Sequence, residues 1–242
     1  MSSHHSAQAF LQEQLARTAR LHAARRADPT RAASLHRLAR WQAVRLRQTY
    51  PDLAVEPRYA AAIRFFENDL YGGGDFGNHD SDLARATSVM SRMLPEKVIL
   101  TVAEAVELNV LSHELDAALL DRLPDPGAPF DVASYCGAYR AMARRDERER
   151  QIGLIGAVGA ALDAHVRKPL VRTALAMMRR PAHLAGFGAL HDFLERGFRA
   201  FRDMHGAHAF LAIVTSREAS LMDRIFAGDA APFADPMGVR PA

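Results

Sequence analysis

The chain has 242 residues, of which 49% are hydrophobic and 24% charged, so it can bury a substantial core and is too apolar to be largely disordered. Its single cysteine, Cys136, excludes an internal disulfide and a cysteine-rich metal site. The N-terminus lacks the pattern of a secretory signal, and the longest apolar run, residues 152–162, is too short for a transmembrane segment. We therefore expect a cytoplasmic protein.

Apolar residues recur every three to four positions along most of the chain, which is the period of a helix and not of a strand. Prolines, glycines and N-cap residues such as Asp28 and Asp131 mark the ends of these helices. The expected helices lie at about residues 6–27, 29–50, 57–71, 80–94, 96–122, 132–167, 169–180, 188–204 and 207–226. Pro169 either begins a helix or kinks the one before it. The sequence predicts an all-α antiparallel bundle of about eight to nine helices with no significant sheet.

Composition and charge suggest how the chain is divided. Residues 1–5 are expected to be disordered, and residues 6–50 to form a basic helical hairpin. The main bundle then spans 51–227, with a conceivable internal linker at 124–130 where prolines and a glycine gather. The last segment, 228–242, is rich in proline, glycine, alanine and aspartate and is expected to be a disordered tail.

The N-terminal hairpin carries most of the positive charge. Residues 1–50 hold nine arginines and two acidic residues, a net charge of +7, although the whole chain carries only +3. Such a basic arm can meet nucleic acid, an anionic surface or the acidic body of its own protein. The candidate anion-binding residues are Arg25, Arg26, Arg37, Arg40, Arg45 and Arg47.

The helix expected at 96–122 combines an apolar stripe with polar side chains. Glu107 and Glu114 are seven residues apart and share a face, while Asn109, His113 and Asp116 form a second polar line beside it. Carboxylates next to a histidine can act as acid and base. However, a carboxylate-bridged metal bundle needs Glu-x-x-His motifs, which the sequence lacks. No metal or cofactor is therefore predicted, and polar residues flanking a core stripe are the simpler interpretation.

Two glycine patterns favour structural roles. The loop at residues 71–80 has neither the preceding strand nor the Lys-Ser/Thr pair of a phosphate loop, so a helix end followed by an N-cap explains it. Gly153, Gly156 and Gly159 recur every three residues in the helix expected at 132–167. Because glycine weakens a helix by about 1 kcal/mol relative to alanine, we expect a close approach of a neighbouring helix to compensate.

The segment at residues 64–72 resembles the signature of the FFLEELY motif proteins, an uncharacterised group of bacterial proteins. Phe65, Phe66, Leu70 and Tyr71 match that signature, and Asp69 replaces a glutamate conservatively. Glu67 and Asn68 depart from it. Segments at 105–116, 147–152 and 193–198 are also similar, so the resemblance extends over most of residues 55–226. It implies no established activity.

Three functions remain open from the sequence. The first is a non-enzymatic helical interaction or regulatory protein, which could form a homo-oligomer or bind a protein partner. The second is binding of nucleic acid or an anionic surface through the basic hairpin, with strongly salt-dependent affinity. The third is an enzyme or metal-binding protein with a site between helices, formed by Glu107, His113 and Glu114 together with Tyr71 or Glu67. The first is favoured because the chain carries no catalytic signature.

Overall fold

A computed structural model of the chain describes residues 2–66, 96–184, 188–229 and 231–236. Within these ranges the chain forms ten helices and no strand, which confirms the predicted all-α bundle. The helices are α1 (Ser2–Ala27), α2 (Pro29–Thr49), α3 (Pro51–Val55), α4 (Pro57–Phe65), α6 (Glu96–Leu120), α7 (Val132–Ala141), α8 (Arg145–Val166), α9 (Pro169–Leu184), α10 (Gly188–Asp203) and α11 (His208–Phe226). The helix predicted at 80–94 lies outside the described residues. None of the described helices is long and apolar enough to cross a membrane.

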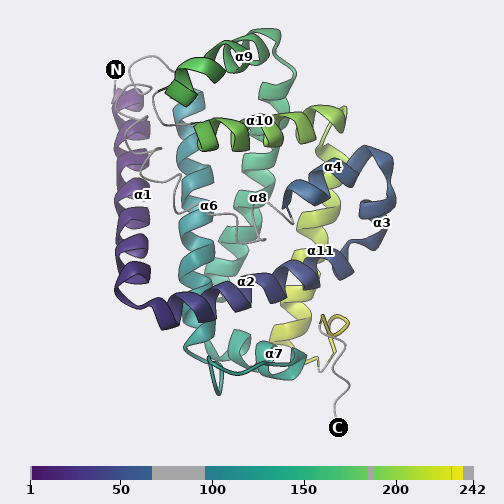
Figure 1. Ribbon diagram of the computed structural model, residues 1–242. Helices are drawn as coiled ribbons and strands as arrows, with labels where there is room; N and C mark the ends of the chain where they lie inside the picture. The colour runs from purple at the N-terminus through teal and green to yellow at the C-terminus, as the bar shows by residue number, and fades with distance from the viewer. Residues whose placement is uncertain (1, 67–95, 185–187, 230, 237–242) are drawn as a thin grey trace.

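The helices α6, α8 and α11 stand in a row and alternate in direction (Figure 1). Helix α1 lies along α6 and runs in the same direction: Leu11 packs near Ile99, and Arg17 further along bonds to Glu114. Helix α2 crosses one face of this row, α7 lies at one end, and α9 and α10 lie at the other (Figure 1). The predicted hairpin of residues 6–50 is therefore part of the bundle, with α1 packed on α6 more than on α2.

Local signals explain several helix boundaries. Asp28 caps α2 by accepting a hydrogen bond from the Arg31 backbone N–H at 2.9 Å, and Asp131 caps α7 by accepting one from Ser134 at 2.8 Å. Helix α1 begins at Ser2, so it includes most of the segment that the sequence places outside the fold.

One helix of the sequence prediction is two in the structure. The expected helix at 132–167 breaks between α7 and α8, where Ala143 adopts a left-handed φ of 53°. Arg144, at the break, donates hydrogen bonds to Glu147 and to the Glu114 carbonyl. The break reorients α7 so that Tyr135 and Tyr139 are both buried. No glycine or proline marks this position in the sequence.

Residues 231–236 fold back on the bundle. The sequence predicts a disordered tail from residue 228, but Phe233 lies 5.9 Å from the Trp41 ring and 6.0 Å from the Tyr135 ring, centroid to centroid. Arg224 donates hydrogen bonds to the carbonyls of Ala231 and Pro232, at 3.1 and 2.7 Å. An aromatic side chain seated among other aromatics therefore holds residues 231–236 in place.

The three glycines of α8 do not share one environment. A Cβ at Gly159 would lie 2.4 Å from Leu211 Cδ2 in α11, closer than atoms can approach without movement. A Cβ at Gly156 would make ordinary contact with Thr215, and one at Gly153 would meet no described residue within 4 Å. The predicted close approach of a neighbouring helix is confirmed at Gly159 and is absent at Gly153.

These two glycines give a matched pair of substitutions. Gly159→Val is expected to lower the free energy of unfolding by about 1–3 kcal/mol, because added carbons overpack the α8–α11 contact. Gly153→Val is expected to change it by less than about 0.5 kcal/mol, because valine and glycine differ little in helix propensity and no described residue lies within 4 Å of an added Cβ. Urea denaturation of both variants measures the difference. Equal effects at the two positions would contradict the packing described here.

Candidate ligand-binding site

The polar residues that the sequence singles out on α6 face different neighbours. Arg150 of α8 donates to both carboxylate oxygens of Glu107, at 3.2 and 2.8 Å. Arg17 of α1 donates to Glu114 Oε2 at 2.6 Å. Arg25 of α1 donates to His113 Nδ1 at 2.8 Å. The structure does not bring Glu107, His113 and Glu114 to a common cavity, so it lends no support to catalysis by this group. The other candidates, Glu67 and Tyr71, lie outside the described residues.

His113 is held as a neutral acceptor. Because arginine only donates hydrogen bonds, Nδ1 must accept, which leaves the ring proton on Nε2. Burial, reinforced by the positive charge of Arg25 and the nearby His22, lowers the pKa of His113 to about 3. The residue lines a second cavity, of about 70 Å³, between α1, α2 and α6. Its described partners assign it to the interface between α1 and α6.

The candidate anion-binding arginines also divide by environment. Arg25 is engaged with His113, Arg37 donates to the Pro126 carbonyl at 2.8 Å, and Arg45 pairs with Glu218. Arg26, Arg40 and Arg47 are exposed. Three of these six arginines therefore contact other parts of the same bundle.

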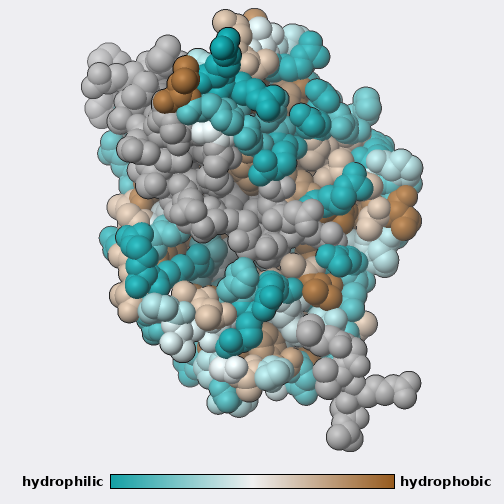
Figure 2. All heavy atoms as spheres, in the orientation of Figure 1, coloured by the Kyte–Doolittle hydropathy of each residue, from teal (hydrophilic) through white to brown (hydrophobic). Residues whose placement is uncertain are grey.

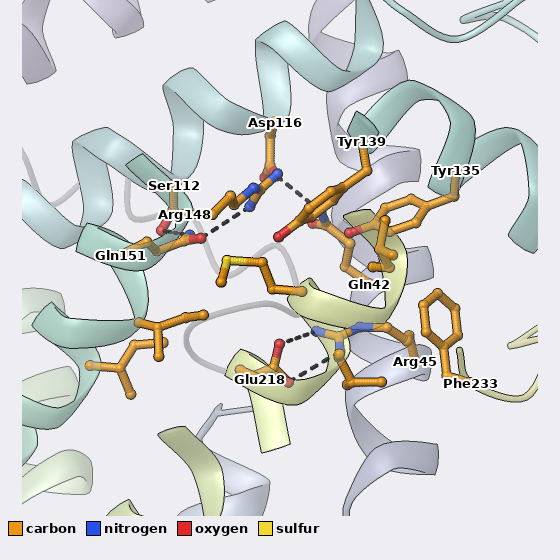
Figure 3. A pocket seen from close by; sticks show the side chains of 15 residues that line it. Gln42, Arg45, Ser112, Asp116, Tyr135, Tyr139, Arg148, Gln151, Glu218 and Phe233 are labelled. Carbon is orange, nitrogen blue, oxygen red and sulfur yellow. Dashed lines mark hydrogen bonds and ion pairs between the residues drawn. The ribbon is translucent and has the colours of Figure 1, made fainter. Parts of the chain in front are cut away.

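A polar cavity of about 60 Å³ lies where α2, α6, α7, α8 and α11 converge. Figure 3 shows Asp116, Arg148, Gln151 and Ser112 at one end of it and the pair Arg45–Glu218 at the other. Tyr135, Tyr139 and Gln42 also line the cavity. The apolar part of the wall is formed by Ile152, Ile155, Leu221, Met222, Ile225 and Phe233.

Arg148 is the most unusual group in this cavity. It begins the face of α8 that continues with Ile152 and Ile155, four and seven residues later, so the helix turns it inward. Its side chain is only 6% exposed. The guanidinium lies 4.6 Å above the Tyr139 ring, and Nη1 donates to Gln151 Oε1 at 3.0 Å. Its Nε and Nη2 are buried and have no hydrogen-bond partner among the described residues.

The two unpartnered nitrogens form one edge of the guanidinium. Nε–H and Nη2–H point in parallel and make the fork that arginine uses to bind two oxygens of one anion. Buried donors without an acceptor cost about 1–3 kcal/mol each, and more on a charged group, so such a fork is rarely left empty. An acceptor other than the described residues, such as a bound anion, would complete it.

Asp116 is the acidic group at the same end of the cavity. Its Oδ1 accepts a hydrogen bond from Gln42 Nε2 at 3.0 Å, and it forms neither an ion pair nor a hydrogen bond with Arg148. Burial raises the pKa of Asp116, while the positive charge of Arg148 and the bond from Gln42 oppose that shift. The carboxyl and the guanidinium thus share the cavity without direct contact.

Arg45 and Glu218 close the opposite end. Arg45 donates two hydrogen bonds to the two Glu218 oxygens, both at 3.1 Å, and the Tyr50 hydroxyl donates to Glu218 Oε1 at 2.8 Å. The two charged side chains are only 11% and 18% exposed. Because each neutralises the other, this pair shapes the cavity without adding net charge.

The groups near the cavity do not form an activated nucleophile. Burial raises the pKa of both Tyr135 and Tyr139, so their hydroxyls stay protonated at neutral pH. Burial also raises the pKa of the Cys136 thiol to about 11, which keeps it in the unreactive form. In the described part of the chain, no three His, Cys, Asp or Glu side chains are placed to hold a metal ion. The arrangement is suited to binding.

Sequence reasoning missed Arg148 because it lies in the charged run 144–150, which is typical of an exposed helix. Within this run, Arg145 pairs with Glu149 on the same helix at 2.9 Å, whereas Arg150 pairs with Glu107 of another helix. The signal that could have identified Arg148 is its spacing, since it shares a helical face with Ile152 and Ile155.

Comparison with known protein families assigns the chain to one of them. A family model described as a domain of unknown function (DUF8198) matches residues 21–232, which is most of the sequence. The chain belongs to this family. The matched region of the DUF8198 domain contains all the cavity-lining residues except Phe233. Neither the curated proteins nor the solved structures yield a significant match. None of these findings bears on the resemblance to FFLEELY motif proteins, which stays a prediction.

Proposed function

We propose that this DUF8198 domain is a non-enzymatic ligand-binding protein that holds a small anion in the cavity around Arg148. The observation that carries the proposal is the buried fork of Nε and Nη2, which lacks an acceptor among the described residues. An anion with two oxygens would satisfy both donors and neutralise the guanidinium. A ligand-controlled domain agrees with the regulatory role expected from the sequence.

The size of the cavity limits the ligand. A water-sized group needs roughly 10–15 Å³ of such volume, so about 60 Å³ admits a molecule of about four to six non-hydrogen atoms. Water alone could fill this space and bridge Arg148 to Asp116. Anion binding predicts that a suitable small anion stabilises the folded protein, whereas water bridging predicts no such stabilisation.

The test is thermal unfolding of the purified protein with formate, acetate, nitrate, phosphate or sulfate, at an ionic strength kept constant with sodium chloride. At a concentration 100 times its dissociation constant, a bound anion stabilises the folded state by about 2.7 kcal/mol. We expect at least one of these anions to raise Tm in the wild type and to lose that effect in Arg148→Met.

Arg150→Met is the matched control, because Arg150 lies two residues away on the same helix and pairs with Glu107 outside the cavity. It should keep the response to the anion. If no anion raises Tm in the wild type, or if both variants respond as the wild type does, the proposal is wrong.

Two partner expectations from the sequence stay predictions. Arg20, Arg26 and Arg40 are exposed and form no ion pair among the described residues, so they are free to contact nucleic acid or an anionic surface. Salt-dependent binding to DNA or to anionic vesicles would test this.

A surface for self-association is offered by exposed apolar side chains on α9. Leu170 and Leu184 of this helix are 83% and 88% exposed. Figure 2 shows hydrophobic and hydrophilic side chains side by side at that end of the molecule, and sedimentation would test association.

A further inference from the structure

The ligand class follows from the charges that the cavity leaves uncompensated. Two arginines reach the cavity, but Arg45 is neutralised by its two hydrogen bonds to Glu218. Arg148 is therefore the cation available to a ligand. Asp116 shares the cavity with it, and a doubly charged anion placed beside that carboxyl would be repelled. The electrostatics favour a monoanion over phosphate or sulfate.

The shape of the donor edge favours a planar group. The fork of Nε and Nη2 offers two parallel N–H bonds in one plane, which matches the two oxygens of a carboxylate. The third nitrogen, Nη1, already donates one of its N–H groups to Gln151, so the edge formed by Nε and Nη2 is the one with both nitrogens unpartnered among the described residues. The two oxygens of a carboxylate match the two parallel N–H bonds of that edge.

The remaining wall favours a short hydrocarbon tail. Beyond the charged groups, the cavity is bounded by Ile152, Ile155, Leu221, Met222 and Phe233. Burying one methylene group in such surroundings stabilises a complex by about 0.8 kcal/mol. A ligand of about four to six non-hydrogen atoms with a carboxylate at one end leaves one to three carbons for this wall.

We infer that the cavity binds a short-chain monocarboxylate, whose carboxylate occupies the Arg148 fork and whose tail lies against the apolar wall. This inference rests on the proposed function and specifies its ligand. It predicts an order of affinity among simple acids: acetate, propionate and butyrate bind with increasing strength, by roughly fourfold for each methylene. Longer acids exceed the cavity and bind more weakly.

The experiment is isothermal titration calorimetry of the full-length protein with acetate, propionate, butyrate, hexanoate, butyramide and phosphate. Butyrate should bind most tightly, and butyramide, which has the same size without the charge, at least tenfold more weakly. Arg148→Lys keeps the positive charge but lacks the fork, so it should weaken butyrate binding at least tenfold. Arg150→Lys should not change it.

The possible outcomes separate this inference from the proposed function. If phosphate binds as tightly as butyrate and needs Arg148, the carboxylate inference is wrong and the proposed function stands. If butyramide binds as well as butyrate, recognition by charge is wrong and so is the inference. If Arg148→Lys unfolds, competition between butyrate and butyramide in the wild type still decides. If none of these compounds binds, the inference is wrong, and the thermal unfolding series with formate, nitrate and sulfate decides the proposed function.

Discussion

Glu218→Gln is expected to lower the free energy of unfolding by about 3–5 kcal/mol, because it removes one charge of the ion pair that Glu218 forms with Arg45 in a largely buried position. The substitution keeps the size of the side chain, so little of the effect can come from altered packing. It also weakens the acceptor of the Tyr50 hydroxyl, which is itself buried. For a chain of this length, Tm should fall by roughly 2–4 °C for each kcal/mol.

Glu149→Gln provides the same substitution at an exposed ion pair. Arg145 and Glu149 lie 2.9 Å apart, with side chains 45% and 51% exposed, and such pairs contribute little because water and salt screen them. This control should change the free energy of unfolding by less than about 0.5 kcal/mol, whereas Glu218→Gln should give the larger loss stated above. Similar small losses at both positions in urea denaturation would mean that water reaches Arg45 freely.

The stability of the protein is expected to fall as His113 is titrated. The folded state holds His113 neutral with a pKa of about 3, whereas the unfolded chain has its ordinary value near 6.5. Below pH 6.5 the unfolded state therefore binds more protons, and the folded state loses stability down to about pH 3. As the pH falls from 7.5 to 5, the protonation of His113 in the unfolded chain should lower the free energy of unfolding by about 2 kcal/mol.

His113→Gln isolates this effect from the titration of the acidic residues. Glutamine does not titrate, and its side-chain oxygen can accept the hydrogen bond from Arg25 in place of Nδ1. We expect the wild type to lose about 2 kcal/mol relative to the variant as pH falls from 7.5 to 5. A difference between the two proteins that stays constant over this range would show that His113 is protonated as easily in the folded state as in the unfolded chain.

The fold could be predicted from the sequence because its signals are local. The apolar positions Leu111, Leu115 and Leu119 of α6 recur with the period of the helix, and all three are buried. The caps Asp28 and Asp131 act within three residues of themselves. The break at Ala143 has no such signal, because it depends on the contact of Arg144 with the Glu114 carbonyl of another helix.

The candidate site could be predicted only in part. Asp116 was visible as one of the polar residues of α6, but its sequence neighbours His113 and Glu114 face α1 instead of the cavity. Which side of α6 meets α8 depends on how the helices pack, and spacing alone does not decide it. Glu218, the partner of Arg45, lies 173 residues away in the sequence. Arg148 shares its cavity with residues of α2, α6, α7 and α11, so its burial is a property of the assembled bundle.

The central claim is that the Arg148 fork is the binding site for a carboxylate. A crystal structure of the protein grown with butyrate tests it most directly. The structure is expected to show both butyrate oxygens within hydrogen-bond distance of Arg148 Nε and Nη2, with the tail against Ile152 and Ile155. Density for water alone in the cavity, or an Asp116 carboxylate bonded directly to the fork, would contradict it.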